Sequence, residues 1–239
     1  MKRVALIAGG AGGLGRALGE ALKRDGFHII ALDLPTAELA ALTDSETVAC
    51  DMTDQQALAQ ACEGICAKHD AIDLVIYAQG ATYLTKFDED CDSQHRRLFE
   101  VNYFASVALA RHMLQPVRAA QGVHLAISSV AGFAPLARRT AYAASKHALE
   151  GFFKSLRGEE AEHGVHVLVA APSFVATNIG AVSSGADSLS RPGSAKDGID
   201  YMSPQNAASA IIDGYKKRRK ITHVGRVSHL SAWAIRIWP

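Results

Sequence analysis

The segment VALIAGGAGGLG, residues 4–15, decides the fold of this chain. Five apolar residues precede a run of glycines, and a stretch with helical spacing of its apolar residues follows directly. A strand, a glycine turn and a helix in this order form the start of a β-α-β unit. Such glycines let the backbone approach a pyrophosphate, and the helix N-terminus offers amide donors to it. Two spacings overlap, Gly10-x-Gly12-x-x-Gly15 and Gly9-x-x-x-Gly13-x-Gly15, and the alternative is a tight turn without a ligand.

Short apolar runs alternate with amphipathic segments beyond this turn. Mostly continuous apolar runs indicate strands that are covered on both faces, as in a parallel sheet. Expected strands are 4–8, 28–32, 47–49, 74–77, 123–128, 165–170 and 221–224, and expected helices are 13–25, 54–69, 92–119, 142–163 and 203–217. The pattern predicts an α/β fold, a doubly wound Rossmann-type parallel sheet of about seven strands with helices on both faces. Residues 1–239 are expected to form one domain.

A carboxylate follows the second expected strand. Asp33 lies 18 residues after Gly15, where an acidic residue can accept hydrogen bonds from both ribose hydroxyls of NAD. The same charge repels the 2′-phosphate of NADP, and no Arg or Lys lies between Gly9 and Gly15 or within two residues of Asp33. We therefore expect NAD(H) as the preferred cofactor, with NADP(H) still possible.

Composition and charge exclude several classes of protein. The net charge is +1, which gives no overall attraction to nucleic acid or anionic lipid. The four cysteines have neither zinc-site nor disulfide spacing, so we expect no metal, reduced thiols and a cytoplasmic location. No apolar run is long enough to cross a bilayer, and the glycine-rich start is read as a buried strand, not as a signal peptide.

The segment TAYAASKHAL, residues 140–149, places Tyr142 and Lys146 four residues apart on one helix face. A nearby ammonium group favours the phenolate and lowers the pKa of a phenol. Tyr-x-x-x-Lys occurs by chance about 0.25 times in a chain of this composition, so the pair alone is weak evidence.

Several ordered motifs together resemble the short-chain dehydrogenase/reductase family, over most of the chain to about Thr177. The glycine turn, with Leu14 inside it, matches the cofactor loop of the family, and Tyr142 with Lys146 matches its Tyr-x-x-x-Lys. Ser129 lies 13 residues before Tyr142, where the catalytic serine is expected. The resemblance extends to the adenine-binding Asp51 and Met52, the helix residue Asn102, and Pro172, Val175 and Thr177 beside the nicotinamide.

The resemblance implies an NAD(H)-dependent oxidoreductase that interconverts a secondary alcohol and a ketone. Tyr142 would be the general acid/base, Ser129 would hold the substrate oxygen, and Lys146 would lower the pKa of Tyr142 and bind the nicotinamide ribose. Asn102 would anchor a water that links Lys146 to solvent. The resemblance also implies a homodimer or homotetramer built from the long helices that begin near Asp92 and Tyr142.

Three motifs depart from the family pattern. The usual Asn-Asn-Ala-Gly is Tyr77-Ala78-Gln79-Gly80 here, where Ala78, Gln79 and Gly80 would form the cofactor wall, and we expect altered packing without loss of activity. Ala8 replaces the threonine that opens the glycine turn. Ser173 replaces a glycine and is expected to narrow the approach to the nicotinamide slightly.

The substrate pocket is expected to combine a long loop with apolar residues. A Ser- and Gly-rich stretch at about 178–203 is expected to be a substrate lid, because long loops in compact domains are often functional. Phe133, Pro135 and Phe174 suggest an apolar pocket wall. Arg138 and Arg139 could meet an anionic substrate, but we prefer to read them as solvated loop residues.

The C-terminal region carries a basic run at 216–220 and an expected amphipathic helix at about 227–238. That helix could cover the pocket, join a subunit interface or contact a membrane surface, in this order of preference. The apolar end is compatible with a longer natural chain. Two other functions stay open: a non-catalytic NAD-binding or sensing module, and a peripheral membrane or nucleic-acid binder that uses the basic run.

Overall fold

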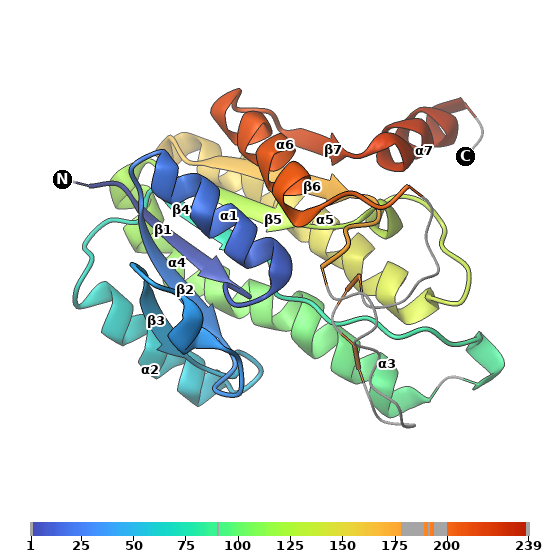
Figure 1. Ribbon diagram of the computed structural model, residues 1–239, viewed down its shortest axis with the longest axis horizontal. Coiled ribbons are helices and arrows are strands. Elements are labelled where there is room, and N and C mark those ends of the chain that lie inside the picture. Colours follow the sequence, from blue (N-terminus) through green and yellow to red (C-terminus); the bar gives the residue numbers. More distant parts are fainter. Residues whose placement is uncertain (1, 90, 178–188, 191, 194–199, 238–239) are drawn as a thin grey trace.

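The structure is a computed structural model that describes residues 2–89, 91–177, 189–190, 192–193 and 200–237. Within these residues, seven parallel strands form one sheet in the order β3-β2-β1-β4-β5-β6-β7 (Figure 1). The strands are β1 (Val4–Ala8), β2 (His28–Asp33), β3 (Glu46–Ala49), β4 (Leu74–Tyr77), β5 (Val123–Ile127), β6 (His166–Pro172) and β7 (Ile221–Val224). The predicted doubly wound α/β fold is confirmed. The strand order reverses between β1 and β4, which places the topological switch point there.

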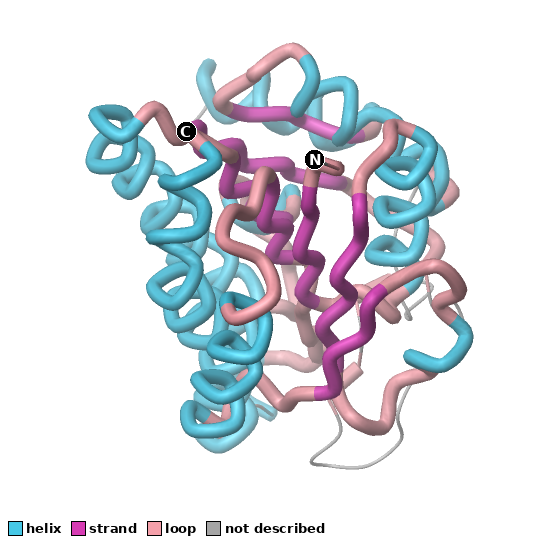
Figure 2. Tube along the Cα trace, turned by 90° about the vertical axis from the view of Figure 1, so that its left-hand side faces the viewer, coloured by secondary structure: helices cyan, strands magenta, loops and turns pink. Residues whose placement is uncertain are grey.

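Helices cover both faces of the sheet, as Figure 2 shows. Helices α1 (Gly13–Arg24) and α6 (Pro204–Lys216) pack on one face, and α2 (Gln55–Cys66), α4 (Ala105–Ala120) and α5 (Thr140–Glu160) pack on the other. The central strands are therefore buried on both sides, and all four residues of β4 are buried. The edge strand β3 alternates between half-buried and exposed residues instead. This difference explains why the central strands are continuous apolar runs in the sequence.

The helix predicted over 92–119 is interrupted. Helix α3 (Asp92–Phe99) continues into a π-helical segment, Glu100–Phe104, before α4 begins. A π-helical turn holds one more residue than an α-helical turn, and such segments are frequent at functional sites. Asn102 lies inside this segment and is completely buried.

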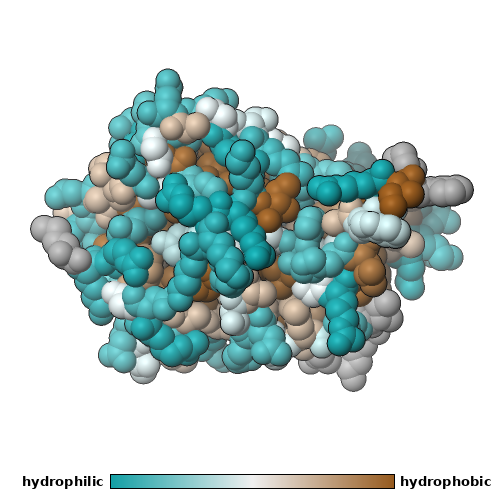
Figure 3. Space-filling model, turned by 90° about the horizontal axis from the view of Figure 1, so that it is seen from above, coloured by the Kyte–Doolittle hydropathy of each residue, from teal (hydrophilic) through white to brown (hydrophobic). Residues whose placement is uncertain are grey.

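Beyond α6 and β7, the chain ends in helix α7 (Arg226–Ile237). Leu230 and Trp233 are each 67% exposed and Ile237 is 61% exposed, so this apolar face has no partner within the described chain. Figure 3 views the side of the molecule that carries α6 and α7, where brown apolar side chains lie among teal polar ones. No helix in the described part of the chain has both the length and the apolar character needed to span a bilayer.

Candidate functional site

A cavity of about 500 Å³ opens at the C-terminal ends of the strands. The C-terminal edge beside the switch point is where α/β folds of this kind bind ligands. All predicted catalytic and cofactor residues line this cavity except Asn102, which lies behind its wall. The lining predicted residues are Gly9, Gly12, Gly13, Leu14, Gly15, Asp33, Asp51, Met52, Ala78, Gln79, Gly80, Ser129, Tyr142, Lys146, Pro172, Val175 and Thr177.

The glycine turn forms the floor at one end of the cavity. Gly9 has φ +77°, and a Cβ atom on it would lie 2.6 Å from the backbone nitrogen of Gln79. A Cβ on Gly15 would lie 2.1 Å from the carbonyl oxygen of Gly9, so neither position accepts a side chain. The amides of Gly9 and Gly10 both donate to the carbonyl of Leu32, at 2.8 and 3.2 Å. These two bonds tie the turn to β2, although Ala8 supplies no hydroxyl for this purpose.

Asp33 ends β2 next to this turn. Its Oδ2 accepts from the amide of Ala11 at 2.9 Å, and its Oδ1 accepts from the amide of Leu34 at 2.8 Å. Because each ionised oxygen has a second lone pair, the carboxylate can still accept from ribose hydroxyls. The carboxylate therefore both holds the turn in place and faces the cavity.

Arg16 is a cation near Asp33 that the sequence argument overlooked. Its Nε donates to the carbonyl of Ala11 at 2.8 Å, and the amide of the same Ala11 donates to Asp33. The guanidinium of Arg16 also lies 3.3 Å from Glu38. Arg16 directly follows the last glycine of the turn, outside the residues next to Asp33 in sequence.

The opposite side of the same end carries Asp51. Its Oδ1 accepts from the amide and the hydroxyl of Thr53, at 2.9 and 2.7 Å. Arg97 donates to the Thr53 hydroxyl at 3.0 Å and lies 3.8 Å from Asp51 Oδ2. Burial raises the pKa of Asp51, but the bonds from Thr53 and the charge of Arg97 outweigh burial and lower this pKa overall. Asp51 is thus held as an oriented anion at the cavity wall.

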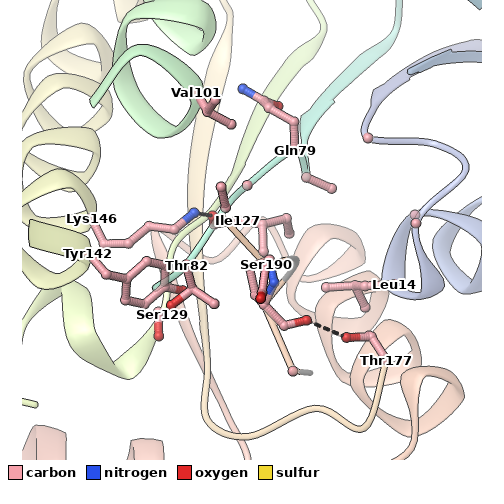
Figure 4. A pocket seen from close by; sticks show the side chains of 18 of the residues that line it. Leu14, Gln79, Thr82, Val101, Ile127, Ser129, Tyr142, Lys146, Thr177 and Ser190 are labelled. Atoms are coloured by element: carbon pink, nitrogen blue, oxygen red, sulfur yellow. Dashed lines mark hydrogen bonds between the residues drawn. The ribbon is translucent and has the colours of Figure 1, made fainter. Parts of the chain in front are cut away.

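Ser129, Tyr142 and Lys146 meet at the other end of the cavity (Figure 4). Tyr142 and Lys146 lie one turn apart on α5, and Ser129 follows β5 by two residues. The Ser129 hydroxyl lies near the Tyr142 phenol and lowers its pKa. Lys146 Nζ donates to the carbonyl of Ile127 at 3.0 Å and lies 5.9 Å from the centre of the Tyr142 ring. The hydroxyl, the phenol and the ammonium group therefore share one wall of the cavity.

The pKa of Tyr142 differs from the sequence-based expectation. Burial raises this pKa above the ordinary value of a tyrosine, although the hydrogen bond with Ser129 and the charge of Arg139 both lower it. The chain's own groups therefore leave Tyr142 protonated at neutral pH, and Lys146, which was expected to lower this pKa, is not among the groups that shift it. A further positive charge is required before the phenol can release its proton easily.

Burial also shifts Lys146. It lowers the pKa of Lys146 from 10.5 to about 8, while the nearby charge of Glu150 raises it. Glu150 lies one turn further along α5, where it accepts from the Ser128 hydroxyl at 2.8 Å and pairs with Lys154. This carboxylate, which sequence reasoning missed, supports the charge on Lys146 from behind the cavity wall.

Asn102 acts as a clamp. Its Oδ1 accepts from the amide of Ala81 at 2.8 Å, and its Nδ2 donates to the Ala81 carbonyl at 3.0 Å and to Ser145 Oγ at 2.9 Å. The side chain therefore connects the π-helical segment to the loop after β4 and to α5. Its three bonds fix the spacing of the elements that carry Gly80 and Lys146. The water-anchoring role remains a prediction.

Residues 3–186 match the model of a family described as short chain dehydrogenase. The chain belongs to the short-chain dehydrogenase/reductase family. It is 32% identical over 232 residues to the Bos taurus protein "Dehydrogenase/reductase SDR family member 7B", covering 91% of this chain and 71% of that protein.

Two solved structures of short-chain dehydrogenases are also similar. One from Streptomyces avermitilis has a TM-score of 0.83 at 25% identity and covers 99% of this chain and 95% of its own. One from Burkholderia cenocepacia J2315, in complex with NADP, has a TM-score of 0.84 at 21% identity and covers 98% and 93%. The chain is thus an oxidoreductase of the short-chain dehydrogenase/reductase family, with the fold of its solved members.

The chain departs from the usual family pattern at the end of β4, where Tyr77 and Gln79 are larger than the family residues. Tyr77 packs 4.7 Å from Phe153, ring centre to ring centre, and its hydroxyl is hydrogen-bonded to His124 Nδ1 at 2.7 Å. Gln79 Nε2 donates to Ser106 Oγ at 2.6 Å, while Gln79 Oε1 is buried without a hydrogen-bond partner among the described residues. An orphaned acceptor on a cavity wall is consistent with a ligand that donates to it.

Ser173 lies between the cavity and the start of α7 in this short-chain dehydrogenase/reductase. Its hydroxyl lies against Gly225, where an added Cβ atom would be only 2.2 Å away. The hydroxyl is therefore turned toward the start of α7, while Ser173 also lines the cavity. Its effect on the nicotinamide approach stays a prediction. The hydroxyl is buried and has no hydrogen-bond partner among the described residues.

Arg139 corrects the reading of the two loop arginines. Arg138 is exposed, but Arg139 is only 8% exposed, lines the cavity and donates to the hydroxyl of Thr82. The expectation that both are solvated is wrong for Arg139. A signal existed in the sequence, because Arg139 lies only three residues before Tyr142 and directly precedes α5. Thr82, two residues after Gly80, could not be found in this way.

The described parts of the expected lid lie beside the cavity. Ser190 pairs with Thr82 through two backbone hydrogen bonds of 2.7 and 2.9 Å, and Thr177 Oγ1 donates to the Pro192 carbonyl at 2.7 Å. Leu189, Ser190, Pro192, Gly193 and Tyr201 line the cavity. Residues 178–188, 191 and 194–199 of the expected lid lie outside the described residues.

The apolar walls only partly match the prediction. Phe174 lines the cavity as expected, together with Leu136, Val130 and Leu189. Phe133 instead packs against His223, 5.0 Å between ring centres, and no α7 residue is among the described lining residues. In the described structure, therefore, helix α7 does not cover the pocket, which was its preferred role from the sequence.

Proposed function

We propose that this short-chain dehydrogenase/reductase transfers hydride between a nicotinamide dinucleotide and a secondary alcohol or its ketone, with Tyr142 as general acid/base. One observation carries the proposal: a single cavity has the glycine turn at one end and the Ser129, Tyr142 and Lys146 wall at the other. A phosphate-binding turn alone would support binding only, and the polar wall alone could belong to many sites. Their presence in one cavity supports a dinucleotide held beside a proton-transfer group.

The cavity fits the cofactor by its chemistry. Gly9 and Gly15 leave no room for side chains where a pyrophosphate would approach, and Gln79 presents an unpartnered acceptor. Asp33 would hold the adenosine ribose, Asp51 the adenine and Lys146 the nicotinamide ribose. When bound, the nicotinamide supplies a hydride acceptor or donor and, in its oxidised form, a positive charge.

We infer a preference for NAD(H) from the charge of Asp33. A carboxylate held by Ala11 and Leu34 cannot turn away from an incoming 2′-phosphate without losing two hydrogen bonds. The nearby cation Arg16 is already bonded to Ala11 and Glu38. These contacts support NAD(H), and NADP(H) remains the alternative.

The residues of the chain would handle the proton. In alcohol oxidation, the carbinol hydrogen leaves as hydride and the hydroxyl proton passes to the Tyr142 phenolate, while Ser129 donates to the substrate oxygen. Ketone reduction is the reverse. An ordinary phenol must lose about 3 pKa units, or about 4 kcal/mol, to do this near neutral pH. Arg139, Ser129 and the cofactor charge act against the burial that raises this pKa.

Leu136, Phe174 and Leu189 support an apolar substrate, because they line the same cavity. Tyr142, Ser129 and Arg139 provide its polar groups. We propose a secondary alcohol or ketone with an apolar body that leaves its oxygen directed at Ser129 and Tyr142. The cavity is therefore expected to prefer hydrophobic carbonyl compounds over small hydrophilic ones.

The test is a panel of secondary alcohols and ketones assayed with NAD(H) and NADP(H), for wild type, Tyr142→Phe and Tyr103→Phe. Tyr103 lies outside the cavity lining, so its variant removes a phenol oxygen without touching the site. We expect turnover by wild type and Tyr103→Phe, and a loss of at least about 100-fold in kcat for Tyr142→Phe with cofactor binding retained.

Four results of this assay would contradict the proposed function or part of it. Binding of NAD without turnover of any compound would favour a sensing module, and turnover that survives Tyr142→Phe would remove the proposed acid/base. A tenfold or greater preference for NADPH would overturn the argument from Asp33. Failure to bind either dinucleotide would refute the proposal as a whole.

A further inference from the structure

A second group of polar side chains lies at the opposite end of the sheet from the cavity. His28 is the first residue of β2, Glu46 is the first residue of β3, and His69 follows α2 by three residues. These three elements lie together at the edge of the sheet in Figure 1. Asp33 ends β2 five residues after His28, about 17 Å along the strand, so this group is separate from the cavity.

The sheet register brings the three side chains together. Strands β2 and β3 run parallel with Ile30 opposite Glu46, so His28 lies two residues earlier and on the same face of β2. His69 arrives from the chain that leaves α2. Its ring centre lies 5.4 Å from that of His28, with 33° between the ring planes. Three segments that are distant in sequence therefore direct imidazole and carboxylate groups to one point.

The donor atoms converge as metal ligands do. Oε2 of Glu46 lies 2.9 Å from His69 Nε2 and 3.5 Å from His28 Nε2, and all three atoms lie within 4.8 Å of one another. Metal–ligand bonds of about 2.1 Å at tetrahedral angles separate neighbouring ligand atoms by about 3.4 Å. The observed spacing needs only small side-chain movements to accept an ion at its centre.

The types of donor select the kind of metal. Two imidazoles and one carboxylate suit zinc and similar divalent transition metals, whereas magnesium and calcium prefer oxygen ligands alone. Three protein ligands leave a fourth position for water, and His28 is exposed enough to admit it, at 36% for its side chain. A preformed set of two histidines and a carboxylate is therefore matched to zinc with one bound water.

Lys68 is the group that competes with a metal. Its Nζ lies 2.8 Å from the other carboxylate oxygen of Glu46, Oε1, and its side chain is 65% exposed. The ammonium group neutralises part of the negative charge of Glu46, which would otherwise attract a metal ion. Without a metal ion, the same ion pair stabilises the ionised form of Glu46. Because the side chain is mostly in solvent, it can move away at small cost.

We propose that His28, Glu46 and His69 form a binding site for Zn²⁺ or a similar divalent transition metal, which would connect β2, β3 and the end of α2. A metal bound only to the folded chain stabilises it, and the gain grows with the logarithm of the free metal concentration above the Kd. The site is independent of the catalytic cavity, so its failure would not affect the proposed reaction.

The test is a titration of the chelator-treated, untagged full chain with Co²⁺, followed by its visible absorption, and with Zn²⁺, followed by calorimetry. All measurements use a Cys91→Ser background, because Cys91 is an exposed thiol that could bind these metals itself. We expect one ion per chain, and a weakening of at least about tenfold in His28→Ala, His69→Ala and Glu46→Gln. His112→Ala removes an exposed imidazole elsewhere and should bind like the parent.

Lys68→Met provides a test in the opposite direction. Removing the competing ammonium group should tighten binding of either metal by about tenfold, because the full carboxylate charge then acts on the ion. Circular dichroism of each variant establishes that it is folded. Absence of saturable binding in the micromolar range, or binding unchanged in the His28→Ala/His69→Ala double variant, would overturn the proposal and leave the group as an ion-pair cluster.

Discussion

Lys146 should make the stability of the fold depend on pH in a way that one substitution removes. Burial lowers its pKa from 10.5 to about 8, so between these values the unfolded chain binds a proton that the folded chain does not. Stability therefore rises with pH in this window, is flat below about pH 8 where both states are charged, and is flat again above 10.5. In Lys146→Met this contribution is absent.

The magnitude follows from the two pKa values. Between pH 7 and pH 10, the proton difference of Lys146 changes the free energy of unfolding by about 2.5 kcal/mol. Other groups act in the opposite direction, because burial raises the pKa of Cys62 to about 12 and raises the pKa of Tyr142. Wild type alone would therefore show a mixture, and the difference between wild type and Lys146→Met isolates the lysine.

The assay is urea denaturation of both proteins at pH 7, 8, 9 and 10, followed by far-ultraviolet circular dichroism and linear extrapolation. Wild type should gain about 2–3 kcal/mol relative to Lys146→Met across this range. The offset at pH 7 does not enter the test, because methionine also removes the bond to the Ile127 carbonyl. A difference that stays constant from pH 7 to pH 10 would refute the reasoning, since it would mean that Lys146 does not titrate there.

Three further predictions test the rest of the site and the core. Asp33→Asn keeps an acceptor for Ala11 but removes the charge, so the ratio of kcat/KM for NADH over NADPH should fall at least about tenfold; an unchanged ratio contradicts the role of Asp33. Gly9→Ala meets the Gln79 backbone and should destabilise by about 2–4 kcal/mol with loss of dinucleotide binding, whereas Gly26→Ala, also at positive φ but in open space, should cost about 1 kcal/mol in denaturation. Burial lowers the pKa of His124 to about 4, so the free energy of unfolding should fall by up to about 3 kcal/mol as pH drops from 6.5 to 4. In His124→Gln this fall should be absent. If both proteins lose the same stability in this pH range, the loss comes from other groups.

The features that the sequence predicted well are local ones. The glycine turn depends on a strand and a helix that adjoin it, and Tyr142 and Lys146 meet because four residues span one helical turn. Continuous apolar runs indicated a sheet covered on both faces, which α1 and α6 on one side and α2, α4 and α5 on the other provide. Each of these patterns can be read within about a dozen residues of sequence.

The features that were missed depend on contacts between distant segments. Arg139 is buried because Thr82, 57 residues earlier, accepts its hydrogen bond. The π-helical segment at Asn102 is not visible in the hydrophobic pattern, since one extra residue in a turn hardly changes the periodicity. Ser173 is turned toward Gly225, the residue directly before α7. Because the two residues are distant in sequence, their contact could not be predicted from the sequence alone.

The pKa shifts at the cavity change how the Tyr142 and Lys146 pair must be understood. Burial raises the pKa of the phenol and lowers that of the ammonium group, so burial disfavours the charged form of both partners. Two buried groups that each resist charging cannot activate one another without outside support. For Lys146 that support comes from Glu150, one helical turn away, and for Tyr142 from Ser129 and Arg139. In the proposed reaction, the remaining cation is the oxidised dinucleotide, so Tyr142 would become acidic only after cofactor binding, and proton transfer would be restricted to the loaded site.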